Sequence, residues 1–438
     1  MQSIKHKIST TLLFFLFVAI AVNSQSIKSF KEVSAKEIKK KDSPLLKAII
    51  SANYNSLLPV SANIAEYELQ IIYTQIDRDK NNNATFTTHF LGQEHPKYFY
   101  PASLVKLPIA VLSLEQINQL NISGLNKDSY MFSDSLLKCL GRVYKDSSST
   151  TGYPSVANYI KKIMLVSDNR SYSRLYEFLG VDYINSKLES KNLKNVFIVN
   201  KFDGFCNAQD HKQRLPILFT NSNFDTLFFQ KPFRSETNYR NPIGKVTKGK
   251  RQITNSGKII NKPKDFTYSN YLNLNDVDAI LKRIFFPLNF VKQERFNLSA
   301  TDYLFLKKYM GMWPRESYSP KYADSPYKDS FKKYLIYGNH HQKIEKDSIR
   351  IFNIVGLSYG AVADCAYIVN RDLGIEFFLS VVLYVNKNGI MNDGKYEYKK
   401  TGFPFMSSLG KAIYEYEYKR KKENKPNLDE LNIDFSKP

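Results

Sequence analysis

The order of strand-like and helix-like segments most constrains what this chain can fold into. Two runs that alternate apolar and polar residues, YELQIIYTQIDRD at 67–79 and TFTTHFLGQ at 85–93, flank an Asn-rich turn and predict a β-hairpin. Three β-branched and aromatic runs follow near the other end, at 348–360, 361–370 and 375–386. The simplest way to bury both sets of strands is one antiparallel sheet built from the two ends of the chain.

The middle of the chain has a different period. Apolar residues recur at i, i+3 and i+4, which is typical of helices, in segments 128–143, 153–168, 170–180, 274–286 and 300–312. From about 195 to 270 the pattern lapses into a loop-rich stretch. We therefore predict an α/β (α+β) fold: an antiparallel sheet from both chain ends, flanked by terminal helices, with an inserted all-helical lobe.

The N-terminus has the pattern of a secretory signal. Two lysines precede an apolar run from Leu12 to Val22 and then small residues, which is too short for a membrane span. We expect an exported, periplasmic or secreted monomer without stable membrane insertion. The predicted division is a signal peptide over 1–24, a Lys-rich leader over 25–44, a domain over 45–420 (sheet lobe 45–100 and 346–420, helical lobe 101–345) and a charged tail over 421–438.

Charge and cysteine content limit the partners. The formal net charge of +22 favours anionic partners such as cell-wall polymer, or is only a solvated lysine-rich surface; nucleic acid is disfavoured by the signal pattern. Three cysteines, Cys139, Cys206 and Cys365, make neither a disulfide framework nor a zinc pattern. At most one bridge could form, and buried free thiols are the favoured state. We expect no metal and no cofactor, and we interpret His340 and His341 as solvent-exposed loop residues.

The stretch YPASLVKLPIAV at 100–111 carries the candidate nucleophile. Ser103 follows the hairpin, stands behind Pro101 and begins an apolar helix, whose free N–H groups favour a developing alkoxide. Lys106, one turn on, lies on the same face and could serve as the base once it is desolvated. The alternative is an ordinary capped helix with a lysine reaching to the surface. Ser-x-x-Lys also occurs elsewhere in the chain, so this spacing alone proves nothing.

A second motif, Ser167-Asp168-Asn169, falls between two predicted helices. By itself it could be a helix N-cap, with Ser167 or Asp168 satisfying free amides. With PASLVKLPIAV, SVANYIKKIMLVSDNRSYSRLYEFLG, VGLSYGAVADCAYIV and SSLGKAIYEYE in this order, however, the sequence resembles the class A β-lactamases and the wider penicillin-recognising serine hydrolases. The resemblance runs from about residue 45 to 418.

The resemblance implies roles for the matching positions. Ser103 would be the acylated nucleophile and Lys106 its base or proton shuttle. Ser167 would relay a proton to the leaving nitrogen, and Asn169 would hold the substrate amide side chain and the lysine. The amides of Ser103 and Leu357 would form the oxyanion hole, and Gly356 would let the substrate approach the strand closely.

Two positions depart from the family pattern. The lysine of the third motif is replaced by Ile354 in FNIVGLSYG, with Arg350 on the same strand as a distant substitute. The literal Lys400-Thr401-Gly402 lies after the last strand, and we interpret it as coincidence. For the deacylating glutamate of class A enzymes, the nearest candidate is Glu236, although a solvated loop carboxylate is the favoured interpretation.

The sequence thus predicts an exported serine hydrolase acting through an acyl-enzyme on Ser103. Its substrate would be a β-lactam or a cell-wall peptide amide, which would place it in β-lactam catabolism and the antibiotic response. The alternative is a catalytically impaired peptidoglycan- or penicillin-binding protein that keeps the fold without the third-motif lysine. A D-alanyl-D-alanine carboxypeptidase or esterase is a third option. Asp364 is interpreted as a structural strand or turn residue.

Overall fold

The computed structural model describes residues 40–134, 139–202, 206–254, 256–323, 326–339, 344 and 348–436. The predicted signal peptide, most of the leader, and His340 and His341 lie outside the described residues. The residues from Lys40 onward form one compact unit.

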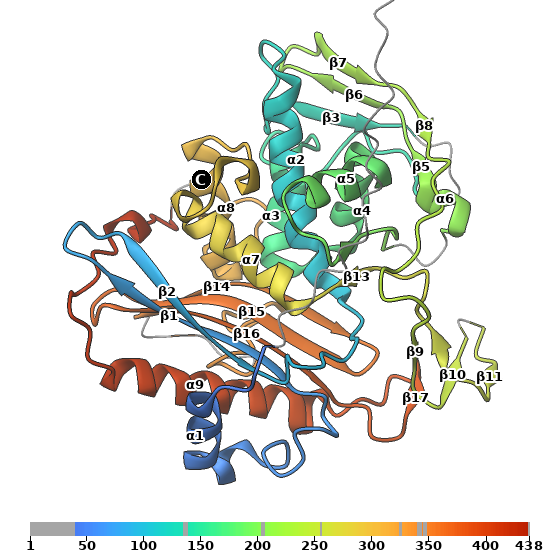
Figure 1. The fold of residues 1–438 in the computed structure, drawn as a ribbon. Helices are drawn as coiled ribbons and strands as arrows, with labels where there is room; N and C mark the ends of the chain where they lie inside the picture. Colours follow the sequence, from blue (N-terminus) through green and yellow to red (C-terminus); the bar gives the residue numbers. More distant parts are fainter. Residues whose placement is uncertain are drawn as a thin grey trace, which may run out of the picture. The chain divides into compact units, whose positions relative to one another are not determined.

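Its centre is a five-stranded antiparallel sheet in the order β14–β15–β16–β1–β2 (Figure 1). The strands are β1 (Gln70–Arg78), β2 (Ala84–Leu91), β14 (Ile349–Ser358), β15 (Ala361–Asn370) and β16 (Ile375–Tyr384). Strand β1 pairs with β16, with Gln70 opposite Val382, so the two ends of the chain meet in the middle of the sheet. The prediction of one antiparallel sheet built from both ends of the chain is confirmed.

Local sequence explains both tight turns of this sheet. In the first hairpin the Asp79 carboxylate accepts the amides of Asn81 and Asn83, while Asn82 adopts the left-handed region at φ 63°. Between β14 and β15, Tyr359 and Gly360 both have positive φ, 51° and 83°. Two such residues give a turn whose twist matches that of the flanking strands.

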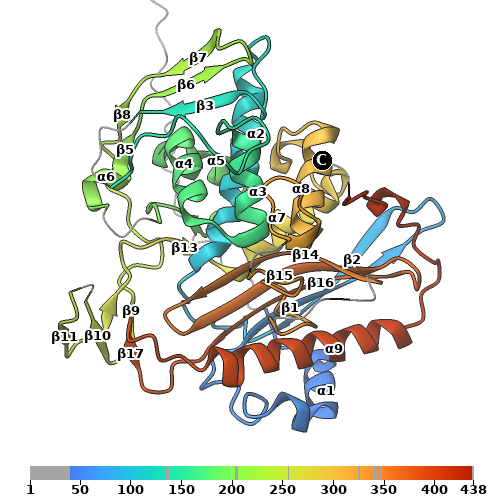
Figure 2. The same cartoon turned by 180° about the vertical axis from the view of Figure 1, so that it is seen from behind.

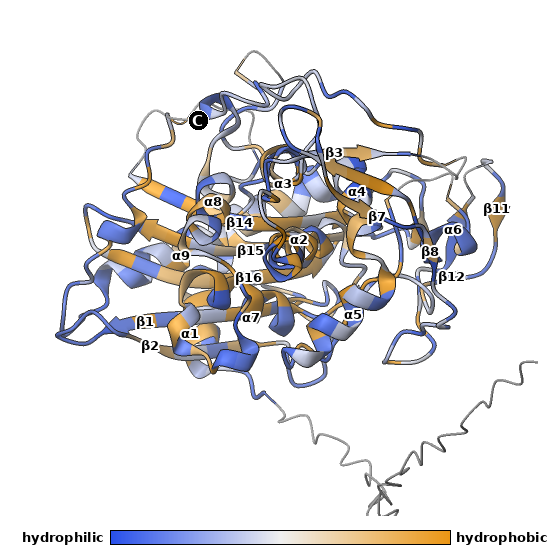
Figure 3. Cartoon of the chain, turned by 90° about the horizontal axis from the view of Figure 1, so that it is seen from above, coloured by the Kyte–Doolittle hydropathy of each residue, from blue (hydrophilic) through white to orange (hydrophobic). Residues whose placement is uncertain are grey.

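Helices cover both faces of the sheet (Figures 1 and 2). The terminal helices α1 (Pro44–Ala52) and α9 (Phe403–Lys419) lie on one face and share a core with it. The other face packs against a lobe that contains α2 (Lys106–Leu120), α7 (Leu274–Phe285) and α8 (Ala300–Gly311). Seen from above, apolar residues run through α2 and the strands beneath it (Figure 3). Helix α2 is buried along most of its length, so it is the axis of this lobe.

The remaining helices of the lobe are α3 (Val156–Val166), α4 (Asn169–Leu179), α5 (Val181–Ser190) and the short α6 (Ala208–Lys212). Oxygen-bearing side chains cap several N-termini by accepting free amides: Ser155 on α3, Asp168 on α4, Asn273 on α7 and Ser299 on α8. The predicted helices at 153–168, 170–180, 274–286 and 300–312 are confirmed.

The lobe is not all-helical: in the predicted helix at 128–143, the described residues 128–134 and 139–143 are not helical. Residues Tyr130–Ser133 form strand β3, in which partly exposed and buried side chains alternate. Strand β3 pairs with β6 (Ile217–Thr220), and β6 with β7 (Thr226–Gln230), within the stretch that we predicted to be loop-rich. A period of two, not 3.6, therefore governs the start of segment 128–143.

Short strands complete the described structure in pairs and one small sheet. They are β4 (Val196–Phe197) with β13 (Tyr271–Leu272), β5 (Gln213–Arg214) with β8 (Phe233–Arg234), β9 (Thr247–Lys248) with β12 (Lys264–Asp265), and β10 (Arg251–Ile253) between β11 (Ile259–Ile260) and β17 (Ile390–Met391).

The C-terminal segment, predicted as a charged tail over 421–438, contributes Leu428, Leu431 and Ile433 to the main core. Burial of these apolar side chains holds the segment against the core, although the sequence around them is rich in lysine. Among the described residues, no helix combines the length and apolar character that crossing a bilayer needs.

Candidate active site

Ser103 lies in a 3-10 turn, Ala102–Val105, that leads directly into α2. The turn is tight: the Leu104 amide donates to the Pro101 carbonyl at 3.0 Å, and Ala102 is held in the left-handed region at φ 46°. An alanine rarely adopts this conformation, because its Cβ makes it unfavourable. Pro108 falls within the first turn of α2, where a missing N–H costs little. The backbone thus presents Ser103 at the start of a buried helix.

The Lys106 ammonium is the centre of the site. Its side chain is fully buried, and Nζ lies 3.0 Å from Ser103 Oγ, 2.9 Å from Ser167 Oγ and 2.7 Å from Asn169 Oδ1. It also donates to the Ser167 carbonyl. The structure therefore brings Ser103, Lys106, Ser167 and Asn169 together. A lysine reaching to the surface, the alternative interpretation, is wrong.

Burial lowers the pKa of Lys106 well below its usual value, because an ammonium loses its hydration there. A second buried lysine, Lys332, lowers this pKa further, whereas the Asp168 carboxylate partly opposes the effect. A lysine in this state releases its proton readily. As a neutral amine it can accept the Ser103 hydroxyl proton across the 3.0 Å contact.

The Ser-Asp-Asn segment joins α3 to α4 and serves two purposes. Asp168 is the N-cap of α4, and its side chain accepts the Ser171 amide at 2.6 Å. Ser167, the residue after α3, adopts a left-handed conformation at φ 58°. This bend turns its hydroxyl and carbonyl toward Lys106. The N-cap interpretation therefore holds for Asp168, while its two neighbours contact the lysine.

Ser103 opens onto a cavity of about 370 Å³. Its described lining consists of Tyr100, Ala102, Ser103, Asn169, Lys201, Phe202, Leu357, Ser358 and Tyr359. Two residues of the predicted set, Asn169 and Leu357, thus join Ser103 at the cavity surface. No carboxylate is present among these described lining residues.

The strand wall of the cavity differs from our expectation at Gly356. A Cβ on this glycine would come within 2.6 Å of the Pro101 carbonyl. Gly356 therefore lets β14 pack against the turn that carries Ser103, and it lies beside the cavity lining instead of in it. The neighbouring Leu357, 38% exposed, does face the cavity.

Neither position considered for a strand cation supplies one to the cavity. Ile354 is fully buried in the core between the sheet and the lobe. Arg350 was a wrong choice of substitute: it binds Glu316 at 2.8 Å and stacks over the Trp313 and Phe435 rings, away from the cavity lining. Its charge is taken up by that ion pair.

Three other candidates also lie outside the cavity lining. Glu236 is exposed, as the favoured interpretation had it. Thr401 and Gly402 are buried at the start of α9, where Gly402 packs against Val362. Asp364 is a buried residue of β15 and accepts the amides of Tyr334 and Leu335; burial raises its pKa to about 7. Its structural role is confirmed.

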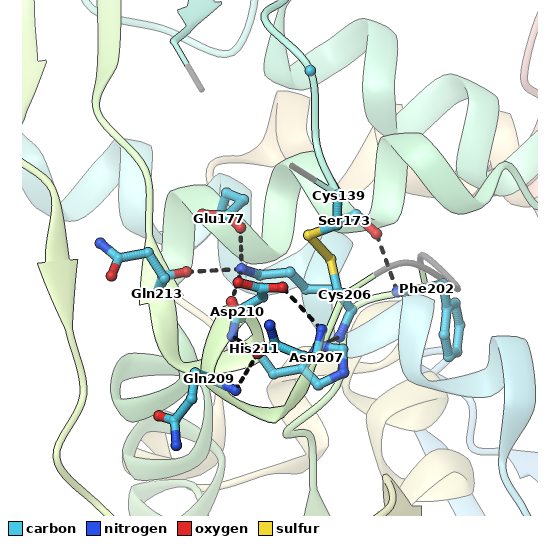
Figure 4. Close-up of a disulfide and its surroundings, with 12 residues drawn as sticks. Cys139, Ser173, Glu177, Phe202, Cys206, Asn207, Gln209, Asp210, His211 and Gln213 are labelled. Carbon is cyan, nitrogen blue, oxygen red and sulfur yellow. Dashed lines mark hydrogen bonds and ion pairs between the residues drawn. A yellow bond between two sulfur atoms is a disulfide. The ribbon is translucent and has the colours of Figure 1, made fainter. Parts of the chain in front are cut away.

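A disulfide joins Cys139 to Cys206, so the expectation of free thiols is wrong for these two residues and holds for Cys365. Figure 4 shows the bridge near Ser173 and Glu177 of α4 and next to Asn207, the N-cap residue of α6. The Phe202 amide donates to Ser173 Oγ at 3.1 Å, and Lys201 forms a buried ion pair with Glu177. This cluster fixes two residues of the cavity lining.

Sequence reasoning missed several aromatic and cationic residues of the site. Tyr100 and Tyr359 stood within the motifs we considered, but aromatic residues there gave no separate signal. Phe202 lies with its ring 5.4 Å from Lys106 Nζ. Lys332 comes from a loop after α8 and belongs to no motif. Its proximity to Lys106 is visible only in three dimensions.

Part of the chain is similar to a known protein family. Residues 60–226, which include both serines, Lys106 and Asn169, match the profile of the β-lactamase enzyme family. The match places this segment, and not the whole chain, in the β-lactamase enzyme family. No curated protein matches the sequence significantly.

Solved structures of similar topology span nearly the whole domain. They include a β-lactamase from Sphaerobacter thermophilus (11% identity, TM-score 0.44, covering 84% of this chain and 97% of that one). A β-lactamase from Xanthomonas campestris pv. campestris is also similar, with 10% identity and a TM-score of 0.43, covering 85% of this chain and 97% of that one. PBP-A has 12% identity and a TM-score of 0.46, covering 86% of this chain and 97% of its own.

Proposed function

We propose that the β-lactamase-family domain is an exported serine hydrolase that forms an acyl-enzyme through Ser103 on a β-lactam or a cell-wall peptide amide. One observation carries the proposal: the buried Lys106 amine lies within 3.0 Å of the hydroxyls of both Ser103 and Ser167. In this arrangement Lys106 takes the Ser103 proton as Oγ attacks the substrate carbonyl. The proton then passes through the Ser167 hydroxyl to the leaving nitrogen.

The remaining roles follow from the cavity lining. The amides of Ser103 and Leu357 are the proposed donors to the developing oxyanion. Asn169 accepts from Lys106 through Oδ1, so its NH₂ group is the part that can meet a substrate carbonyl. The size of the cavity, about 370 Å³, suits a small bicyclic amide or the end of a peptide.

Export is supported by two features. The N-terminal sequence has the signal pattern described above, and the Cys139–Cys206 disulfide is of the kind that persists in oxidising compartments. We therefore propose a periplasmic or secreted location.

Covalent labelling with a fluorescent penicillin, read by intact-protein mass spectrometry, tests the proposal. We expect one adduct on the wild-type chain and none on Ser103→Ala. The matched control is Ser358→Ala, which removes another serine of the same cavity lining and should label normally. An unlabelled wild-type protein, or equal labelling of Ser103→Ala, would contradict the proposal.

The second candidate, a binding protein with impaired turnover, is favoured by the buried Ile354 and by the absence of a carboxylate among the described lining residues. Turnover separates the two. A hydrolase releases many equivalents of nitrocefin or muropeptide product per protein, whereas a binder stops after one equivalent. A comparison of cephalosporin with muropeptide turnover then identifies a β-lactamase or a carboxypeptidase.

A further inference from the structure

A second lysine lies buried behind the site. Lys332 belongs to the segment between α8 and β14 and is 4% exposed. Its backbone is held in the left-handed region at φ 65°. The Lys332 amide donates to Asn339 Oδ1 at 2.9 Å, and its carbonyl accepts from Asn353 Nδ2 at 2.7 Å. A strained lysine fixed on both sides of its backbone indicates that its side-chain position matters.

The Lys332 ammonium ends at the C-terminus of α3. Nζ donates to the Met164 carbonyl at 2.7 Å and to the Ile163 carbonyl at 3.3 Å. The last carbonyls of a helix lack amide partners within the helix, and the negative end of its dipole attracts a cation. Lys332 therefore satisfies the helix end from which Ser167 follows.

The bend at Ser167 explains why the end of α3 binds a lysine side chain. The Asp168 amide, which would continue the helix by donating to Met164, donates to the Lys162 carbonyl instead. The Met164 carbonyl thereby loses its amide partner, and Lys332 provides the replacement. The same bend directs the Ser167 oxygens to Lys106.

We infer that Lys332 is a positioning residue of the Ser103 site, which holds the end of α3 so that Ser167 meets Lys106 and places a positive charge behind both. The inference rests on the proposed function for its catalytic meaning. Lys332 is not one of the described lining residues, and its ammonium binds backbone carbonyls of α3, so it acts through Ser167 and Lys106.

The electrostatic part of this role concerns Lys106. After burial, the Lys332 charge is the largest cause that lowers the pKa of Lys106, and Asp168 acts in the opposite direction. Burial also lowers the pKa of Lys332 itself, to about 7, against the attraction of Asp364. Lys333, the adjacent lysine, is the other cation beside Lys332. Because the two ammonium groups repel each other, the proton of Lys106 is released at lower pH.

Lys333 supplies the matched control. It is the same residue type, equally buried and next in sequence, but its ammonium donates to the carbonyls of Met310 and Ile351 and to Asn353 Oδ1. A purely structural role for a buried lysine would apply to both residues. A role in the Ser103 site belongs to Lys332 alone.

The test measures the pKa of Lys106 directly, by NMR titration of the full chain labelled with ¹³C,¹⁵N-lysine. The Lys106 signal is assigned with Lys106→Arg. In Lys332→Met we expect this pKa to rise by about one unit, which leaves about tenfold less neutral amine at a pH below the pKa. In Lys333→Met it should not move. Lys332→Arg, which keeps the charge and the donors, should stay close to wild type.

Penicillin labelling provides the second readout. In Lys332→Met the pH range over which the labelling rate rises should move to higher pH by the same amount. The difference in labelling rate between this variant and wild type should therefore become smaller in alkaline solution. If Lys332→Met does not fold, as judged by circular dichroism, Lys332→Gln removes the charge and keeps an N–H donor one bond shorter.

The two proposals can fail separately. If wild-type protein is not labelled, the proposed function falls, whereas the titration of Lys106 still decides the place of Lys332. The inference is overturned if Lys106 titrates identically in wild type and in the Lys332 variants, or if Lys333→Met shifts it equally.

Discussion

The two walls of the Ser103 cavity differ in what holds them. On the helix side, Ser103, Lys106, Ser167 and Asn169 form one polar cluster around a buried amine. On the strand side, Leu357, Ser358 and Tyr359 line the cavity, while the side chain of Ile354 is in the apolar core.

This difference separates two tasks of such a site. The helix wall contains the groups that can move a proton to and from a serine. The strand wall offers backbone and mostly uncharged side chains, so recognition of an anionic substrate group is weakened there. Of the lysines near the site, Lys201 is part of the cavity lining and pairs with Glu177, whereas Lys332 lies behind the helix wall. Three substitutions test whether the two walls are as different as they look.

Lys106→Met should have the largest effect. It removes the base from the helix wall, and we expect penicillin labelling to slow by about 10²- to 10⁴-fold, the usual contribution of a positioned general base. In wild type the rate should rise as pH passes through the lowered pKa of Lys106, because the neutral amine is the active form. Stopped-flow labelling over a pH series measures both. Lys161→Met is the control, because this half-buried lysine of α3 lies over the Tyr309 ring and outside the cavity lining. A similar loss there would contradict the assignment.

Ile354→Lys should mainly reduce the stability of the fold, and affect penicillin labelling less. It buries an ammonium in the main core, and we expect the free energy of unfolding to fall by about 3 kcal/mol or more. Ile354→Val, which only removes a methyl group, should cost about 1 kcal/mol. Urea unfolding compares the two. A variant with lysine that is as stable as wild type and labels faster would show that the strand wall accepts a cation.

Gly356→Ala should have the smallest of the three effects. Its Cβ would meet the Pro101 carbonyl at 2.6 Å and push on the turn that carries Ser103. We expect a loss of about 1–3 kcal/mol, typical of overpacking, and slower labelling. Gly141→Ala, at a described glycine with open space around its would-be Cβ, should change neither. Normal stability and labelling of Gly356→Ala would mean that β14 and the turn are less tightly joined than their contacts indicate.

The helix wall could be predicted from sequence, because its residues lie in two short motifs at the ends of strongly periodic helices. Ser103 and Lys106 are one helical turn apart, and Ser167 and Asn169 flank an N-cap residue. The strand wall was harder. Sequence could place Gly356 and Leu357 on a strand, but not say which of them faces the cavity. Lys332 could not be predicted, since its contact with Met164 spans 168 residues and involves only a backbone carbonyl.

The two hairpins show the same limit for the fold. Strands β1 and β2 were predicted because each is long and joined by an Asn-rich turn. Strands β6 and β7 also flank an Asn-rich turn, in which Asn221 accepts the amides of Asn223 and Asp225. They are short, and their partner β3 lies some ninety positions away in the chain. The short strands β3, β6 and β7 gave no pattern in the local sequence from which their pairing could be predicted. The sequence around the three cysteines likewise did not show that Cys139 pairs with Cys206.

The pairing of β1 with β16 has a consequence for how this protein is made. The N-terminal hairpin is completed in sequence long before residues 375–384, the strand beside which it must lie. A two-stranded hairpin is marginally stable alone, and closing so long a loop is slow. During synthesis the hairpin therefore remains without its neighbouring strand until nearly the whole chain has been made. For the export proposed above, that delay is an advantage, because the sheet forms only once its last strand has been made.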